Sequence, residues 1–443
     1  MSSSLNRRTL LRRATTAGVA LALPKWFLES SVAPVSAAEK SPNARPRIAL
    51  VGCGGMGMYD ANLAVPFGDI VALCDVDAGR LGEAAKLYPK AQSFSDYRKV
   101  CDLKEVDAII NATPDHWHTL VNLRAIASGK DVYAEKPLTM TIDEGKRLVA
   151  AVKSSDRILQ TGSQQRSNKT FRLAVELVRN GRLGKIHRVR VWIPQGLYGG
   201  PFTVKPVPQE LDWDMWQGQV AATDYVPERC HRTFRYWYDY SGGTMTDWGA
   251  HHNDIALWGL NKENTGPVKI EGRAMIAPVP GGYSAPSRYR IRYEYEDGVE
   301  HLTHSTSANG WGGGVEGEPK PGEKYHGVQF EGEHGWIYVS RDHVLEASDP
   351  ELIATPLESS ATRLPPIDDH MANFFECLET RKQPICHVEI GHRSATVCHL
   401  GVAAVKLRRP LKWDPVNQEF IGDAEANGLL AREQRKPYCY EEA

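Results

Sequence analysis

The stretch GGTMTDWGAHHNDIALWGL, residues 242–260, concentrates side chains that can move protons. If the run from Asp247 is helical, a rotation of about 100° per residue places Asp247 and His251 on one stripe. A histidine titrates near neutral pH and can take the hydroxyl proton when a secondary alcohol is oxidised. A carboxylate one helical turn earlier lies within hydrogen-bonding reach and would hold the imidazole in one tautomer. The pattern therefore predicts an Asp247–His251 acid–base pair.

Other interpretations of this stretch concern its remaining polar residues. His252 points away from the stripe and is a candidate for the wall of a substrate pocket. Asp247, His251, His252 and Asp254 are all metal-binding residue types, but adjacent histidines on a helix diverge and no HExxH-like spacing occurs, so we expect no metal. A buried polar stripe packed against a sheet is the structural alternative, and it suits Asp254 and Trp258 better than direct chemistry does.

A second chemical signal lies in RIALVGCGGMGMYDANLAV, near the start of the chain. Gly52, Gly54 and Gly57 fit G-x-G-x-x-G between a predicted buried strand and a predicted helix, which is typical of a dinucleotide-binding turn. The helix N-terminus would face a pyrophosphate with free N–H groups. Asp75 ends the next apolar strand, where a carboxylate accepts the ribose hydroxyls and disfavours a 2′-phosphate. We therefore expect NAD rather than NADP, although the nearby Arg80 weakens that preference.

The elements that must position these residues alternate along the first half of the chain. Predicted strands at 107–111 and 131–134 are each followed by a helix, and RILQTG begins another strand, which indicates a doubly wound parallel sheet. Ligands of such sheets bind beyond the carboxyl ends of the strands. The segments CGGMG, TPDHWH and AEKPLT lie there, and Pro137 favours an extended Lys136 that points toward the nicotinamide. We expect the dinucleotide to contact Met56, Thr113, Trp117 by stacking, His118 by a hydrogen bond, Glu135 and Gln164.

The bulk composition is that of an ordinary globular protein. The chain has 443 residues, of which 42% are hydrophobic and 24% charged, and this length suggests two domains. A formal net charge of −1 favours neither nucleic acid nor an anionic membrane as a partner. The eight cysteines form no CxxC pair, so we expect buried free thiols rather than a disulfide framework.

The N-terminus carries a targeting pattern. Arg7 and Arg8 precede an apolar run that is too short to span a bilayer, and PVSAAEK offers a cleavage site near Ala37 or Ala38. Residues 1–38 are therefore predicted to be a twin-arginine export signal, with an uncleaved amphipathic anchor as the alternative. We expect a periplasmic or exported protein without a membrane span. Because the twin-arginine route carries folded proteins, export also predicts a tightly bound cofactor.

The motifs VGCGGMG, CDVD, ATPDHWH and AEKPLT, in this order, resemble those of the glucose–fructose oxidoreductase/inositol dehydrogenase (Gfo/Idh/MocA) family. The 242–260 stretch and the tail beginning GHRSATVCHLG resemble an exported bacterial branch of it. The resemblance implies an NAD(P)-binding Rossmann domain, at 39–163, and a C-terminal α+β domain at 164–443 with a large, mostly antiparallel open sheet. Segments such as KIHRVRVWIPQG and VQFEGEHGWIYVSRD alternate as strands of that sheet should. The sheet is often used for subunit contacts, so we expect a homo-oligomer, either a dimer or a tetramer.

The resemblance also implies an activity and a set of site residues. Lys136, Asp247 and His251 would be the catalytic set of an NAD(P)-dependent oxidoreductase that acts on a sugar or sugar-like polyol. Arg166, Arg235 and His252 are expected to meet that substrate. Outside the cytoplasm there is no pool of free NAD, so we expect a retained cofactor and a redox-neutral cycle. One alternative is an NAD-dependent glycoside hydrolase or lyase that oxidises a hydroxyl transiently; another is a non-catalytic sugar sensor, which would need none of the three catalytic residues.

Overall fold

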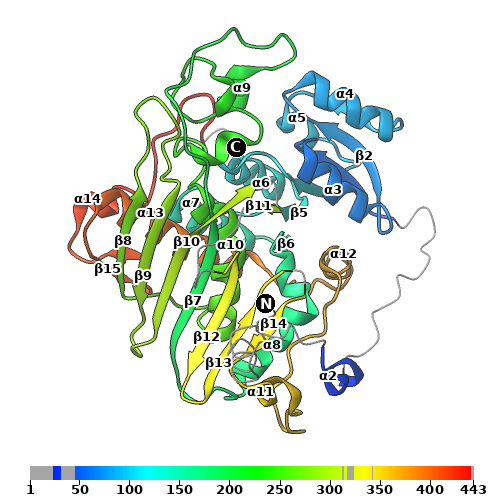
Figure 1. Cartoon of the computed structure of the whole chain (residues 1–443). Coiled ribbons are helices and arrows are strands. Elements are labelled where there is room, and N and C mark those ends of the chain that lie inside the picture. Colours follow the sequence, from blue (N-terminus) through cyan, green and yellow to red (C-terminus); the bar gives the residue numbers. More distant parts are fainter. Residues whose placement is uncertain (1–22, 31–44, 312–313, 317–323, 342, 441–443) are drawn as a thin grey trace, which may run out of the picture.

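The computed structural model describes residues 23–30, 45–311, 314–316, 324–341 and 343–440. Two sheets organise this part of the chain (Figure 1). The first lies in the N-terminal half and the second in the C-terminal half. The buried hydrophobic side chains gather on both faces of the first sheet and between the second sheet and its helices.

The N-terminal sheet is parallel and has six strands in the order β3-β2-β1-β4-β5-β6. The central strand, β1, is buried from Ile48 to Val51, because helices cover both faces of the sheet. This arrangement confirms the predicted doubly wound Rossmann sheet. The strands are β1 (Arg47–Val51), β2 (Asp69–Cys74), β3 (Gln92–Phe94), β4 (Ala108–Asn111), β5 (Asp131–Ala134) and β6 (Leu159–Thr161). The helices are α3 (Gly55–Ala64), α4 (Ala78–Leu87), α5 (Tyr97–Cys101), η2 (Asp115–Trp117), α6 (His118–Ala127) and α7 (Ile142–Lys153).

The C-terminal sheet follows the order β14-β13-β12-β7-β10-β9-β8-β15-β16, with β11 paired to β10. Only the β7–β10 pair among these described strands is parallel, so the predicted mostly antiparallel open sheet is confirmed. Its strands are β7 (Ile186–Gln195), β8 (Lys269–Ile276), β9 (Arg288–Glu294), β10 (Glu300–Trp311), β11 (Gly314–Glu316), β12 (Gly327–Gly332), β13 (Gly335–Val339), β14 (Leu345–Ala347), β15 (Leu411–Asp414) and β16 (Glu419–Phe420).

Three long helices cover one face of this second sheet. Helix α10 (Thr244–Leu260) packs on β7, α13 (Val388–Leu407) packs on β8, and α8 (Lys169–Arg179) packs beside α10. Helix α10 begins after Gly243, and the positive φ of 73° at this glycine lets the backbone change direction before the helix. The observed helix confirms the one predicted after the Gly-Gly break. Shorter helices are η3 (Gln164–Ser167), α9 (Trp213–Gln217), η4 (Pro227–Arg229), η5 (Thr233–Tyr236), α11 (Glu351–Ala354), α12 (His370–Thr380) and α14 (Ala424–Asn427).

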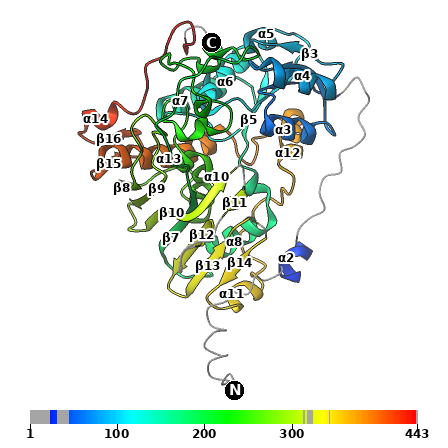
Figure 2. The ribbon, with the colours of Figure 1, turned by 45° about the horizontal axis from the view of Figure 1, so that its top comes forward.

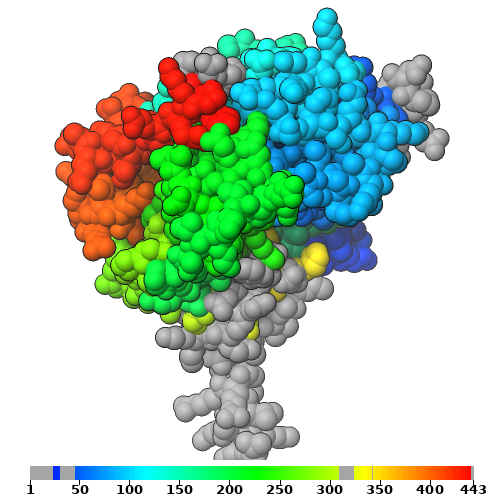
Figure 3. Space-filling view, turned by 90° about the horizontal axis from the view of Figure 1, so that it is seen from above, coloured from blue at the N-terminus to red at the C-terminus, as the bar shows by residue number. Residues whose placement is uncertain are grey.

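The segment 196–243, between β7 and α10, lies against the Rossmann domain. The backbone N–H of Ala78 donates to the carbonyl of Glu210 at 2.8 Å, and that of Asp212 donates to the carbonyl of Val76 at 3.0 Å. Figure 3 shows this segment in green beside the blue N-terminal domain. We call residues 208–236 the strap, because they tie the second domain to the chain just after β2.

Parts of the C-terminal half also complete the Rossmann core. Phe375 of α12 stacks on Phe67, with ring centroids 5.3 Å apart, and Phe374 of the same helix is fully buried. Tyr438 in the tail packs edge-on against Trp117 at 5.4 Å. The two halves of the chain therefore share an interior.

A short helix, α2 (Lys25–Ser30), lies within the range predicted to be an export signal. It packs beside α11 (Figures 1 and 2). Phe27 is 1% exposed, with the guanidinium of Arg172 4.9 Å from its ring, and the indole of Trp26 donates to the carbonyl of Ala354 at 3.0 Å. Cleavage near residue 38 would remove these contacts. The predicted signal outside 23–30 falls beyond the described residues.

The structure also shows the state of the cysteines and the character of the described helices. All eight cysteines are buried and free, as expected from their spacing. Within the described part of the chain, no helix has both the length and the apolar character needed to cross a membrane.

Candidate active site

A cavity of about 870 Å³ lies between the Rossmann domain, the strap and helix α10. Its floor is the turn between β1 and α3, and its walls are the carboxyl ends of the parallel strands, as expected for a doubly wound sheet. At its far end the cavity is lined by residues of η5, α10 and the loop after β13. The glycine turn and the predicted proton-transfer residues therefore open into one space.

The glycine turn has the geometry that a dinucleotide needs. Gly52 has a φ of 93°, and a Cβ there would lie 2.6 Å from the carbonyl carbon of Ala112. A side chain on Gly57 would collide with the carbonyl oxygen of Gly52. Gly57 does not line the cavity, so it permits close helix packing rather than ligand contact. Gly54 caps α3 without a side chain, and the first turn of the helix contains no acidic residue, so its N–H groups can meet an anion.

Asp75 lines the cavity at the end of β2, where the ribose of a dinucleotide is expected. Its carboxylate accepts hydrogen bonds from the backbone N–H of Cys53 at 2.8 Å and of Asp77 at 2.9 Å. Burial raises the pKa of Asp75, and these bonds and Arg80 oppose that effect. The carboxylate therefore also holds the glycine turn in place. Arg80 and His231 line the same region, and His231 Nε2 lies 3.3 Å from Asp77 Oδ2.

Four of the predicted cofactor contacts line the cavity: Met56, Thr113, Trp117 and Gln164. Met56 is 44% exposed on the first turn of α3. Trp117 is held in orientation because its indole donates to the carbonyl of Trp216 at 3.0 Å. Gln164 is held by the carboxylate of Glu135, to which its amide donates at 2.8 Å.

Two other predicted cofactor contacts, His118 and Glu135, lie behind the cavity wall. The ring nitrogens of His118 contact the carbonyls of Pro137 at 2.7 Å and Thr113 at 2.9 Å. Glu135 is 4% exposed, and it accepts a hydrogen bond from the backbone N–H of Lys136 at 3.2 Å. The structure does not bring either side chain to the cavity where the cofactor contact was predicted; both connect and support the loops that carry Thr113 and Lys136.

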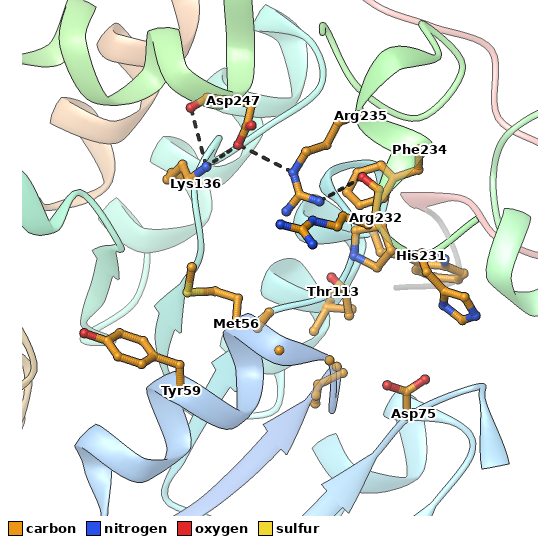
Figure 4. A pocket seen from close by; sticks show the side chains of 18 of the residues that line it. Met56, Tyr59, Asp75, Thr113, Lys136, His231, Arg232, Phe234, Arg235 and Asp247 are labelled. Carbon is orange, nitrogen blue, oxygen red and sulfur yellow. Dashed lines mark hydrogen bonds and ion pairs between the residues drawn. The ribbon is translucent and has the colours of Figure 1, made fainter. Parts of the chain in front are cut away.

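Lys136 and Asp247 form the central contact of the site (Figure 4). Lys136 Nζ lies 2.6 Å from Asp247 Oδ1, and Arg235 Nε lies 3.5 Å from the same oxygen. Burial alone would raise the pKa of Asp247, but the charges of Lys136 and Arg235 outweigh it and lower the pKa to about 2. The carboxylate is therefore ionised throughout the physiological range, and it holds Lys136 at the cavity wall.

His251 lies on the same face of α10, one turn after Asp247. It lines the cavity, is 7% exposed, and its Nδ1 has no hydrogen-bond partner. Burial lowers its pKa well below 6.5, and the charges of Arg341 and Lys136 add to that effect. The predicted Asp247–His251 hydrogen bond is absent, because Asp247 turns to Lys136 instead. A neutral imidazole therefore lines the cavity beside the Lys136–Asp247 contact.

Two predicted substrate contacts are instead part of the protein interior. Arg166 is 1% exposed and donates to both carboxylate oxygens of Asp254, at 2.7 and 2.8 Å, and to Glu263 at 2.7 Å. His252 is fully buried and stacks on His326 with centroids 5.2 Å apart. Neither lines the cavity where the substrate contact was predicted, whereas Arg235, the third predicted contact, does line it. The structural interpretation of Asp254 holds.

Several cavity residues carry no local signal in the sequence. Arg341, in the loop after β13, donates from Nε to Gln165 Oε1 at 3.0 Å and lies 4.8 Å from the ring of Trp248. Only the pairing of β12 and β13 brings it to the cavity. The aromatic wall comes from the strap and α10. Its members are Trp216, Phe234, Tyr236 and Trp248.

Comparison with known protein families shows to which family the chain belongs. Residues 46–163 match the model described as "Oxidoreductase family, NAD-binding Rossmann fold". Residues 192–440 match the model described as "Oxidoreductase family, C-terminal alpha/beta domain". The chain belongs to the Gfo/Idh/MocA oxidoreductase family. The resemblance inferred from the four short motifs is thus confirmed at the level of the family.

Two relatives and one solved structure illustrate this membership. An uncharacterized oxidoreductase of Bacillus subtilis is 26% identical over 52% of this chain and 58% of its own length. The myo-inositol 2-dehydrogenase of Thermotoga maritima is 28% identical over 33% of this chain and 44% of its own length. The chain thus spans about half the length of these relatives. The fold matches the WlbA dehydrogenase of Bordetella pertussis, solved with NADH and UDP-GlcNAcA, with a TM-score of 0.62 and 19% identity, over 84% of this chain and 99% of that one.

Like other members of the Gfo/Idh/MocA family, this chain has an NAD-binding Rossmann domain, and its residues fit that cofactor. Gly52 has a positive φ, and Gly54 caps the N-terminus of α3 without a side chain. Backbone N–H groups there are therefore open to a pyrophosphate. Asp75, Thr113 and Trp117 line the remaining path along the sheet edge. Among the residues that the structure describes, no cluster of three His, Cys, Asp or Glu side chains has the arrangement of a metal site.

Proposed function

We propose that this protein oxidises a secondary hydroxyl of a sugar or polyol, with Lys136, Asp247 and His251 as the proton-handling set. The observation that carries the proposal is the Lys136–Asp247 contact of 2.6 Å beside His251, with all three residues lining the cavity that the glycine turn also lines. The inositol dehydrogenase among its relatives supports a polyol substrate.

Bound NAD supplies the hydride acceptor, and the residues of the chain handle the proton. The ammonium of Lys136 donates a hydrogen bond to the reacting oxygen and stabilises the charge that develops there. Asp247 holds that ammonium at the cavity wall. His251 is neutral, because burial lowers its pKa, and as a residue of the cavity lining it can accept the hydroxyl proton.

We further propose that the cofactor stays bound between turnovers. The strap supports this, because it crosses from the C-terminal domain to the chain after β2 and is held there by backbone hydrogen bonds. His231, Arg232 and Phe234 of the strap line the cavity, so a dinucleotide in the groove would lie between two domains. A retained cofactor requires that every hydride taken from one substrate is returned to another, which is a redox-neutral cycle.

Export through the twin-arginine route forms part of the proposal. Its support is Arg7 and Arg8, the short apolar run and the small residues before Ala38. Retention and export suit each other, because a protein beyond the cytoplasm has no free NAD to draw on. Fractionation of the native host and N-terminal sequencing of the protein would test this part separately.

The central test is to purify the protein, dialyse it exhaustively, denature it and quantify the released nucleotide. We expect about one NAD(H) per chain, as retention requires. Addition of inositols and aldoses to the undenatured holoprotein should then convert bound NAD to NADH, seen in its near-ultraviolet absorbance. Protein that holds nucleotide but reduces it with no polyol or sugar would overturn the oxidoreductase assignment. Empty protein that turns over with added NAD would overturn retention alone.

A further inference from the structure

Residues 428–440, which we call the clasp, follow α14 and cross the Rossmann domain next to the strap. The backbone N–H of Asp143, in α7, donates to the carbonyl of Leu430 at 2.9 Å. Near the other end of the clasp, the hydroxyl of Tyr440 donates to Glu144 of the same helix at 3.2 Å. Figure 3 shows the red clasp against the green segment that contains the strap. The clasp is therefore fixed to α7 near both of its ends, and its middle meets the strap.

Arg435 is the residue of the clasp that holds the strap. Its backbone N–H donates to the carbonyl of Gln219 at 2.8 Å. Its Nε donates to the carbonyls of Gly218 and Val220, at 3.0 and 3.2 Å. Carbonyls at the end of a helix lack partners within that helix, and a cationic donor can satisfy them. One arginine thus binds three consecutive carbonyls of the turn that follows α9.

The guanidinium also ties this turn to the first turn of α9. Arg435 Nη1 lies 2.6 Å from Asp214 Oδ1, and Nη2 donates to the carbonyl of Asp214 at 2.9 Å. The hydroxyl of Tyr438 donates to the other carboxylate oxygen of Asp214 at 3.0 Å. The side chain of Asp214 is 63% exposed, so water weakens this ion pair. The bonds to the backbone carbonyls therefore contribute most to the attachment.

The turn held by Arg435 lies directly against Trp117 in the cavity wall. Gly218 has a φ of 57°, and a Cβ there would collide with the indole of Trp117. That indole donates to the carbonyl of Trp216 at 3.0 Å, and Tyr438 packs edge-on against its ring at 5.4 Å. Both tryptophans line the cavity, whereas Arg435 and Tyr438 lie outside its lining. Any effect of the clasp on a bound cofactor must therefore pass through the cavity residues that it holds.

We propose that the clasp slows the release of NAD(H), with Arg435 as the positioning residue that keeps α9 and Trp117 at the cavity wall. The inference rests on the proposed retention of the cofactor and names the residues that produce it. A dinucleotide between the strap and the Rossmann domain leaves more easily when the strap moves away. Because the clasp is fixed to α7, that movement breaks the bonds of Arg435 to the turn after α9. Loss of those bonds should favour the open strap and speed release.

The strap has a second attachment to the Rossmann domain, which limits the size of the effect. The backbone bonds of Ala78 with Glu210 and of Asp212 with Val76 hold its first residues and do not involve the clasp. These bonds remain when Arg435 is replaced. We therefore expect faster release of the cofactor rather than loss of the site.

The test measures the release of NADH from the holoprotein. Protein loaded with NADH is mixed with a large excess of NAD+, and the fall in NADH fluorescence gives the release rate without any substrate. Release from Arg435→Met should be about tenfold faster than from the wild type, since hydrogen bonds of a charged group are lost and such losses act mostly on dissociation. Arg435→Lys keeps the charge but not the planar fork, so its rate should lie between the two.

Asp214→Ala is a second variant, and it decides the question if Arg435→Met does not fold. The exposed side chain of Asp214 should tolerate replacement, and release should be about threefold faster. In the double variant the increase should be smaller than the product of the single effects, because both changes act on one contact. Arg409→Met is the matched control, since Arg409 bonds to Asp423 and Glu425 away from the cavity. It should leave the release rate unchanged.

The outcomes separate the clasp from the proposed function. Wild-type release rates in Arg435→Met and Asp214→Ala would overturn the clasp, and so would an equal increase in Arg409→Met, because that would reflect a general loss of stability. Wild-type protein that releases NADH within the mixing time would overturn retention and the clasp together. Failure of every sugar and polyol to reduce bound NAD would overturn the oxidoreductase proposal alone, because the fluorescence measurement needs no turnover.

Discussion

Lys136 Nζ lies 2.6 Å from Asp247 Oδ1, and the contact joins the loop after β5 to the first turn of α10. The two residues belong to different domains, so the contact exists only when the domains are packed together. It leaves His251, the third proton-handling residue, without a partner at Nδ1. The geometry thus couples domain assembly to the formation of the site.

Replacement of Lys136 by Met should abolish turnover while the cofactor remains bound. The change removes the cation that meets the reacting oxygen, and we expect kcat to fall by roughly 10³-fold. The released nucleotide per chain should match that of the wild type, because the glycine turn is untouched. Lys146→Met is the control, since Lys146 donates to the carbonyl of Gln418 outside the cavity. Full activity in Lys136→Met would show that Lys136 is not a catalytic residue.

The pH dependence of kcat/KM should show an unusually acidic lower limb. Burial, Arg341 and Lys136 lower the pKa of His251 well below 6.5, so the imidazole stays neutral as the pH falls through that value. Activity that needs a neutral His251 should therefore decline only below pH 6.5. Arg341→Gln removes a positive charge, which raises the pKa of His251 and should move the limb upward. A wild-type limb at or above pH 6.5 would contradict this.

Helix α2 should stabilise the uncleaved chain through Phe27. Its side chain is 1% exposed, and truncation to Ala should lower the free energy of unfolding by about 3 kcal/mol, from lost burial and a cavity. Leu28, on the same helix, is 48% exposed, so Leu28→Ala should change it by less than about 0.5 kcal/mol. Urea unfolding of the full chain measures both. Equal midpoints for Phe27→Ala and Leu28→Ala would show that α2 is not docked in solution.

Arg166→Met should damage stability rather than substrate binding. It leaves Asp254 buried without its main partner, which we expect to cost about 4 kcal/mol. KM of the remaining folded protein should stay within about twofold, because Arg166 does not line the cavity. Thermal unfolding and steady-state kinetics on the same preparation give both quantities. A raised KM with unchanged stability would show that Arg166 contributes to substrate binding.

Local sequence patterns are sufficient to predict the helices and strands of the Rossmann domain and the residues of α10 that face the cavity. The spacing of Gly52, Gly54 and Gly57 predicts the turn, because only a residue without a side chain fits there. The helical period around Asp247 correctly separates His251 from His252. The positive φ of Gly52 and the helical period depend on backbone geometry within a few residues, whereas the close approach of Ala112 to Gly52 comes from the packing of the sheet.

The partners of the charged residues were decided by the tertiary structure. Asp247 pairs with Lys136 rather than His251, Arg166 pairs with Asp254 inside the protein, and Arg341 reaches the cavity from a loop with no motif. A buried charge takes the nearest compensating group in space. That group lies far away along the chain in each of these pairs, so only the packing of the two domains determines it.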